Sequence, residues 1–171
     1  MPRRFAVVLV VALGLAAIVG SGGGGGGGPA STETINGLQV PPDPGPAGVA
    51  TVAGIDTDGN GIRDDVDRFI ATNHGSSPAE VAAARVSAKA LQAILMADSA
   101  SAEDSTLAVH GSMDAGVCVA RSLLTAGVAP TPFLNALFAK TNNTLERITQ
   151  RTAVTMRAGL IARGATAVVC P

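Results

Sequence analysis

The sequence predicts an all-α domain, a small bundle of four to five helices, and three observations lead to this prediction. From about Ile55 onward, apolar residues recur three and four positions apart, as they do on one face of a helix. Capping residues and prolines precede these stretches, and glycines follow them. No alternating run of Val, Ile and Thr is long enough to compete as a strand. We therefore expect one core, built largely from Ala.

The first two expected helices follow each other closely. One covers Asp65 to Thr72 and ends at Gly75. The capping box Ser77-Pro78-Ala79-Glu80 begins the next, with Pro at the first helical position. Their expected core-facing residues recur at helical spacing: Val66, Phe69 and Ile70 on the first, and Val81, Ala84, Ala88, Leu91 and Leu95 on the second.

Three further helices are expected toward the C-terminus. One starts near Ser101, with Glu103 and Asp104 at the positive end of the helix dipole, and stops at Gly127. A shorter helix starts at Thr131-Pro132, and the last runs from about Leu145 to Ala162. Their expected core-facing residues are Val109, Met113, Val117, Ala120 and Leu124, then Phe133, Leu134, Leu137 and Phe138, then Leu145, Ile148, Thr152, Met156 and Leu160.

The segment before these helices is expected to be an export signal followed by a linker. Arg3 and Arg4 precede an apolar run from Phe5 to Gly20, shorter than the about 20 residues of a membrane span. We expect a signal peptide at residues 1–21, with an uncleaved membrane anchor as the alternative. Glycines and prolines then predict a flexible linker over residues 22–54, which leaves residues 55–171 as the helical domain.

The end of the apolar run carries a family resemblance. Ile18-Val19-Gly20-Ser21-Gly22 resembles the lipobox of bacterial lipoproteins, with Ser21 in place of the lipid-bearing Cys. The resemblance implies a bacterial exported protein, periplasmic or secreted, that is not lipidated. Its partner is then expected to be an unidentified envelope or extracellular component, with membrane contact only if the signal stays uncleaved.

The charge balance argues against nucleic acid as a partner. Lys and Arg number 12 and Asp and Glu 13, and Trp and Tyr, which stack on bases, are absent from the sequence. Arg147, Arg151 and Arg157 stand together on the last expected helix. We expect them to form a solvated helix face, and a site for an acidic partner is the alternative.

Two cysteines, Cys118 and Cys170, are the whole thiol content of the sequence. An even count in an exported protein favours a disulfide, which would tie the C-terminal tail to the bundle. The alternative is one buried Cys and one free thiol in the tail.

Residues 56–67 carry the most specific chemistry of the chain. Oxygen-bearing side chains occupy positions 1, 3, 5, 9 and 12 of this loop, Gly61 stands at position 6, and the backbone carbonyl of Ile62 at position 7 can also point inward. Ca²⁺ takes six to eight hard oxygen ligands, and this alternation directs successive groups at one centre. The expected Ca²⁺ ligands are Asp56, Asp58, Asn60, Ile62, Asp64 and Asp67.

This loop is similar to the EF-hand-type loops of dockerin modules and thrombospondin type 3 repeats. The resemblance implies Ca²⁺ as the bound ion, and covers about 15 residues. It departs from those families in having a single loop, no amphipathic entry helix, and Asp67 rather than Glu at position 12. Neither cohesin binding nor a calcium-sensor switch is therefore expected.

A structural alternative accounts for part of the pattern. Asp64 could cap the following helix, and Asp65 and Asp67 could interact with its dipole. That alternative leaves Asp56, Asp58, Asn60 and Gly61 unexplained. Magnesium is less suitable than calcium, because it prefers few carboxylates and keeps bound waters.

The sequence offers one weak enzymatic hypothesis. His110 lies beside the apolar stripe of the third expected helix, with Ser112 and Asp114 close in sequence, and a small secreted hydrolase could use it. No Gly-x-Ser-x-Gly motif accompanies these residues. We favour a non-enzymatic binding domain with one structural Ca²⁺ and assign no catalytic residue.

Overall fold

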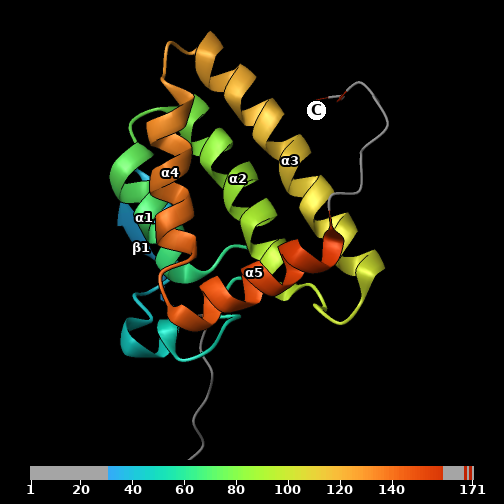
Figure 1. Ribbon diagram of the computed structural model, residues 1–171. Coiled ribbons are helices and arrows are strands. Elements are labelled where there is room, and N and C mark those ends of the chain that lie inside the picture. Colours follow the sequence, from blue (N-terminus) through green and yellow to red (C-terminus); the bar gives the residue numbers. More distant parts are fainter. Residues whose placement is uncertain (1–30, 160–167, 169, 171) are drawn as a thin grey trace, which may run out of the picture.

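The computed structural model describes residues 31–159, 168 and 170, and in them five α-helices follow a short β-hairpin (Figure 1). The helices are α1 (Asp64–His74), α2 (Pro78–Met96), α3 (Ala102–Thr125), α4 (Pro130–Thr141) and α5 (Leu145–Ala158). The expected helical architecture is therefore confirmed. The expected signal peptide at 1–21, the glycine run and the continuation of the last helix to Ala162 lie outside the described residues.

The N-terminal part of the described chain contains a small sheet that the sequence analysis did not expect. Strands β1 (Glu33–Ile35) and β2 (Leu38–Val40) pair antiparallel, with Ile35 opposite Leu38. Asn36 and Gly37 connect them with φ of 48° and 80°, the left-handed conformation that a two-residue hairpin turn requires. The Asn-Gly dipeptide is a strong hairpin signal, and it could have identified this element.

Helices α2 and α3 start after the capping residues expected from the sequence, whereas α4 starts at Pro130, before the expected Thr131-Pro132 cap. Ser77 Oγ accepts from the backbone N–H of Glu80 at 3.4 Å, and Ser101 Oγ accepts from that of Asp104 at 3.1 Å. Both hydrogen bonds satisfy amides that the first helical turn leaves without a partner. The predicted beginnings of α2 and α3 are therefore confirmed.

Helix α2 is the centre of the bundle. It contacts each of the other four helices, and Figure 1 shows α3 and α4 beside it while α5 crosses one end of the bundle. All five residues expected to face the core from α2 are buried. The buried cluster around it also takes Ile62, Val66, Ile70, Val119, Leu123, Phe133 and Leu137 from the neighbouring segments.

Helix α3 presents a different face to the core from the one expected. Val119 and Leu123 are buried, whereas Met113 and Leu124 are 56% and 66% exposed. The two apolar stripes of α3 lie one position apart, so periodicity alone did not distinguish them. The buried stripe also contains Ser105, whose Oγ donates to the carbonyl of Asp98 at 3.2 Å and so satisfies its hydroxyl.

The expected orientation of α5 was wrong as well. Leu145 and Met156 are 74% and 77% exposed, while Arg147, Val154 and Ala158 are buried. The basic face that the sequence analysis placed in solvent is thus largely the packed face of α5. Arg151 lies on the same face, with its guanidinium 4.5 Å from the centre of the Phe138 ring.

Arg147 explains this orientation, because its guanidinium binds the segment that precedes the loop at residues 56–67. Its nitrogens donate to the backbone carbonyls of Gly48 (2.7 Å), Thr51 (2.9 Å) and Val52 (3.2 Å). A fourth hydrogen bond goes to the side chain of Asn143. Among the described residues, no carboxylate lies within 4.0 Å of this guanidinium, so its hydrogen bonds go to carbonyl oxygens, while the charges of Asp65 and Glu146 act on it from farther away.

Residues 31–54 consequently differ from the exposed linker expected over residues 22–54. After the hairpin, the chain forms a 3-10 helix, η1 (Gly45–Val49), and both η1 and the strands contact α1. Val40 and Gly48 are buried, and the guanidinium of Arg68 reaches Glu33 at 2.7 Å. This proline-containing segment is therefore docked on the helical bundle rather than free in solvent.

The expected disulfide joins Cys118 and Cys170, with an S–S distance of 2.05 Å. It ties the end of the chain to the middle of α3 across a sequence separation of 52 residues. None of the described helices is both long enough and apolar enough to cross a lipid bilayer.

Replacing Arg147 by Met should destabilise the domain and release residues 45–54. The substitution keeps much of the side-chain volume but leaves three carbonyls without their donor, a loss of about 3 kcal/mol and on the order of 10 °C in Tm. Hydrogen exchange measured by mass spectrometry should show faster amide exchange in residues 45–54. The matched control is Arg157→Met, an exposed position on the same helix, which should leave exchange unchanged. Equal exchange in the two variants would contradict the role assigned to Arg147.

Candidate functional site

The loop at residues 56–67 connects the docked N-terminal segment to α1, and its last four residues form the first turn of that helix. The backbone N–H of Asp64 donates to the carbonyl of Ile55 at 2.8 Å and closes the loop at its base. Gly59 and Gly61 have φ of 69° and 83°, which L-residues with a side chain adopt only with strain. Two of the glycines in the motif are thus required by the path of the backbone.

Three of the expected ligand residues are held together by hydrogen bonds. The Asp56 carboxylate accepts from the backbone N–H groups of Asn60 (3.1 Å) and Gly61 (2.9 Å). The Asp58 carboxylate accepts from the same N–H of Asn60 (3.1 Å) and from its side-chain amide (3.0 Å). Positions 1, 3 and 5 therefore point their oxygen-bearing groups to the inside of one turn.

The side chain of Asn60 links this turn to the start of α1. Its amide nitrogen donates to Asp58 and also to Oδ2 of Asp67, at 2.7 Å. A single N–H₂ group thus stands between two carboxylates that come from opposite ends of the loop. Position 12 is thereby brought to positions 3 and 5 of the loop.

Asp67 is the most unusual residue of the cluster. It is only 3% exposed, and its Oδ1 is buried without a hydrogen-bond donor, with Arg85 Nε 4.0 Å away. Burial raises the pKa of the Asp67 carboxyl, and the charges of Asp58 and Asp56 raise it further, against the opposing effects of Asn60 and Arg85. The surrounding groups therefore only partly offset the cost of keeping the Asp67 carboxylate ionised.

Two further expected ligands, Asp64 and Ile62, also make hydrogen bonds within the loop. Asp64 directs both carboxylate oxygens to Thr57, accepting from its backbone N–H at 2.8 Å and its hydroxyl at 2.5 Å. The Ile62 side chain is buried in the core, and its N–H donates to Asn60 Oδ1 at 2.7 Å. Asp64 is thus occupied in bracing the loop, apart from the Asp56, Asp58, Asn60 and Asp67 cluster.

With these hydrogen bonds in place, no three His, Cys, Asp or Glu side chains in the described part of the chain are grouped so that they could hold a metal ion. The carboxylates are linked through N–H groups of Asn60 and Gly61 rather than facing one centre. Asp56, Asp58, Asn60 and Asp67 are the residues that could supply oxygen ligands if these N–H contacts were exchanged for a cation.

The sequence pattern did not indicate the role of Arg63, at position 8 of the loop. It is 1% exposed, and its guanidinium donates to the carbonyls of Thr141 (2.9 Å) and Lys140 (3.3 Å) at the end of α4. It also pairs with Asp65 at 2.9 Å, and Lys140 Nζ lies 3.1 Å from the same carboxylate. Burial alone would raise the pKa of Asp65, but the hydrogen bonds and charges of Arg63 and Lys140 outweigh it and lower that pKa.

The residues of the hydrolase hypothesis are only partly brought together. His110 and Asp114 line one open hollow along α3, one helical turn apart. Ser112 lines different hollows, against α2 and α4. The described lining of the His110 hollow therefore does not contain the serine that the hypothesis requires.

Comparison with known proteins identifies no relative: no family model, curated protein or solved structure matches the chain.

Alanine substitutions at Gly54 and Gly59 should separate backbone strain from packing around Arg63. Both glycines have left-handed φ, 70° and 69°, so each substitution costs on the order of 1 kcal/mol in strain. A Cβ at Gly54 would lie 2.3 Å from Arg63 Cδ and 3.0 Å from Arg147 Nη2, whereas one at Gly59 meets nothing within 4 Å. Chemical denaturation should find Gly54→Ala less stable than Gly59→Ala by about 2 kcal/mol. Equal losses would show that the two arginines yield without cost.

Proposed function

We propose that residues 56–67 bind one Ca²⁺ ion, and that the ion stabilises the junction between the N-terminal segment and the helical bundle. Asp56, Asp58, Asn60 and Asp67 would supply side-chain oxygens, and the carbonyl of Ile62 is a further candidate ligand. Ca²⁺ would replace the Asn60 amide as the group that compensates Asp58 and Asp67. Asp64 would remain with Thr57, as a residue that positions the loop.

The observation that carries this proposal is the buried carboxylate of Asp67. One of its oxygens has no hydrogen-bond donor, although the residue is almost completely buried. Buried charges in proteins are normally paired or bound to metal, because desolvation is otherwise costly. A divalent cation beside Asp67 would supply the missing compensation, and would also reduce the repulsion from Asp56 and Asp58.

The choice of Ca²⁺ rests on the donor set. Carboxylate, amide and carbonyl oxygens suit a hard cation, and the described loop offers no thiolate or imidazole. A loop with several carboxylates favours Ca²⁺ over Mg²⁺, which demands strict octahedral geometry and retains water. The similarity to dockerin and thrombospondin type 3 loops supports the same choice.

We further propose that the protein is exported and serves as a non-enzymatic binding domain in the cell envelope or outside the cell. The disulfide suits an oxidising compartment, where Ca²⁺ is also abundant enough to fill a site of modest affinity. The residue pattern at 1–22 supports export in the same way. The ion would then act structurally, keeping the N-terminal segment and α1 in fixed relative positions.

Thermal unfolding with Ca²⁺ and with EGTA tests the site. If Kd is on the order of 10⁻⁴ M, 10 mM Ca²⁺ adds about 2.7 kcal/mol, or on the order of 10 °C in Tm. Far-UV circular dichroism reports the transition, and titration calorimetry with Ca²⁺ and Mg²⁺ measures binding directly. A chain whose Tm and heats do not respond to Ca²⁺ would refute the proposal.

The variant Asp67→Asn distinguishes a ligand from a merely structural residue. In EGTA its Tm should equal or exceed that of the wild type, because the substitution removes an under-compensated buried charge. In Ca²⁺ it should lose the stabilisation. Asp43→Asn, outside the loop and exposed, is the matched control and should keep the full Ca²⁺ response. A variant that is destabilised equally in both conditions would contradict the ligand role.

A further inference from the structure

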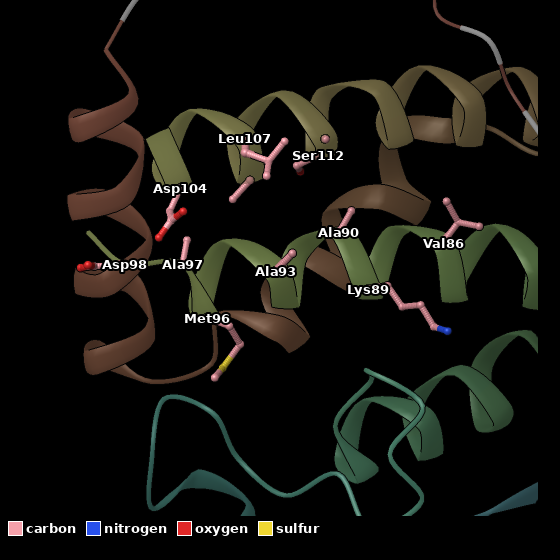
Figure 2. A pocket seen from close by; sticks show the side chains of 12 residues that line it. Val86, Lys89, Ala90, Ala93, Met96, Ala97, Asp98, Asp104, Leu107 and Ser112 are labelled. Carbon is pink, nitrogen blue, oxygen red and sulfur yellow. The ribbon is translucent and has the colours of Figure 1, made fainter. Parts of the chain in front are cut away.

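The outer face of the α2–α3 hairpin carries an open apolar groove that the calcium proposal does not use. Its volume is about 860 Å³. Figure 2 shows its side chains coming from the two neighbouring helices. Val86, Met96 and Leu107 border it and are 43%, 57% and 73% exposed. Large apolar side chains gathered on one solvent-facing surface are typical of an interaction site.

The spacing and small size of the residues that line the groove suit it to packing against another pair of helices. Along α2 and its C-cap residue Ala97, the lining residues Val86, Ala90, Ala93 and Ala97 are spaced four, three and four apart, as in the seam of a coiled coil. On α3 the floor is formed by Ala108 and Gly111. Small side chains let a second pair of helices approach closely, and two such hairpins pack as a four-helix bundle.

The charges at the groove select its occupant. Asp98 and Asp104 stand at one end, where α2 passes into α3, and Lys89 lies toward the other end (Figure 2). A two-fold axis through the middle of the groove, near Ala93, would place Lys89 of each copy against Asp98 and Asp104 of its partner. The face is therefore complementary in charge to itself when one copy is reversed.

We propose that the protein forms a two-fold symmetric homodimer through the α2–α3 groove. The two hairpins pack antiparallel, the alanine floors meet at the axis, and Met96 and Leu107 become covered. The groove from Val86 to Met96 is only about 15 Å long, so it buries a small interface area. We therefore expect a dimer that dissociates reversibly. This proposal is independent of whether Ca²⁺ binds.

Sedimentation velocity of the purified chain over concentrations from about 1 to about 200 µM tests the dimer. The wild type should shift from monomer toward twice the monomer mass as its concentration rises. Ala93→Glu places a charge at the symmetry axis of the groove and should raise the dimer Kd more than tenfold. Ala136→Glu, an exposed alanine on α4 outside the groove, should associate like the wild type. Circular dichroism of each variant confirms that its helices are intact.

Complementary charge reversals test the antiparallel arrangement itself. Lys89→Asp and the double variant Asp98→Lys with Asp104→Lys should each dimerise more weakly than the wild type. An equimolar mixture of the two should recover dimer, because both ends of the mixed interface then pair opposite charges. Failure of the mixture to recover would refute the two-fold arrangement.

Other occupants give different results. A wild-type chain that stays monomeric at 200 µM would overturn the proposal. The proposal would also be overturned if the chain stays monomeric and binds a fluorescent fatty acid, and Ala93→Glu abolishes that binding. That result would assign the groove to an acyl chain. Association that Ala93→Glu and Ala136→Glu weaken equally would place the interface elsewhere.

Discussion

The need to solvate one buried charge, the guanidinium of Arg147, organises much of this domain. Carbonyl groups of residues 48–52 accept its hydrogen bonds, and no carboxylate of the described chain lies within 4.0 Å of it. Desolvating a cation is expensive, so the segment that carries those carbonyls has to stay docked. The same constraint turns α5 about its axis, placing Arg147 inside and Leu145, Ile148 and Met156 outside. A polar requirement thus overrides the apolar periodicity of the helix.

How well the fold follows from the sequence depends on how unambiguous each local signal is. Helix α2 begins at a capping box, and its start and its expected buried residues agree with the structure. Helix α3 has two neighbouring apolar stripes, so only packing decides which is buried. For α5 the deciding partner lies nearly a hundred positions away in sequence, beyond the reach of any local pattern: Arg147 and Gly48 are separated by 99 residues. The Asn36-Gly37 hairpin was predictable, and the prolines around it obscured the signal.

In the candidate site, too, some features follow from the local sequence and others depend on residues far along the chain. The alternation of Asp56, Asp58 and Asn60 around a glycine implies a turn with its oxygens inside, and the hydrogen bonds have that arrangement. Spacing alone could not separate Asp64 from the other acids, because its partner is a threonine hydroxyl within the same loop. Nor could it assign Arg63, whose carbonyl partners come from the end of α4, 77 and 78 positions later. Loop ligands are local in sequence, and the residues that hold the loop against the bundle are not.

Those long separations have a consequence for the order in which the chain can fold. Helices α2 and α3 are adjacent in sequence and can pair as soon as both exist. Arg63 meets the end of α4, and the carbonyls of residues 48–52 meet Arg147, only after nearly the whole chain is available. A polypeptide that emerges N-terminus first can therefore pack the hairpin and η1 against α1 early, whereas the carbonyls of residues 48–52 gain their Arg147 donor only when α5 appears. A chain truncated before α5 should therefore keep the contacts of the hairpin and η1 with α1, but leave the carbonyls of Gly48, Thr51 and Val52 without their guanidinium donor.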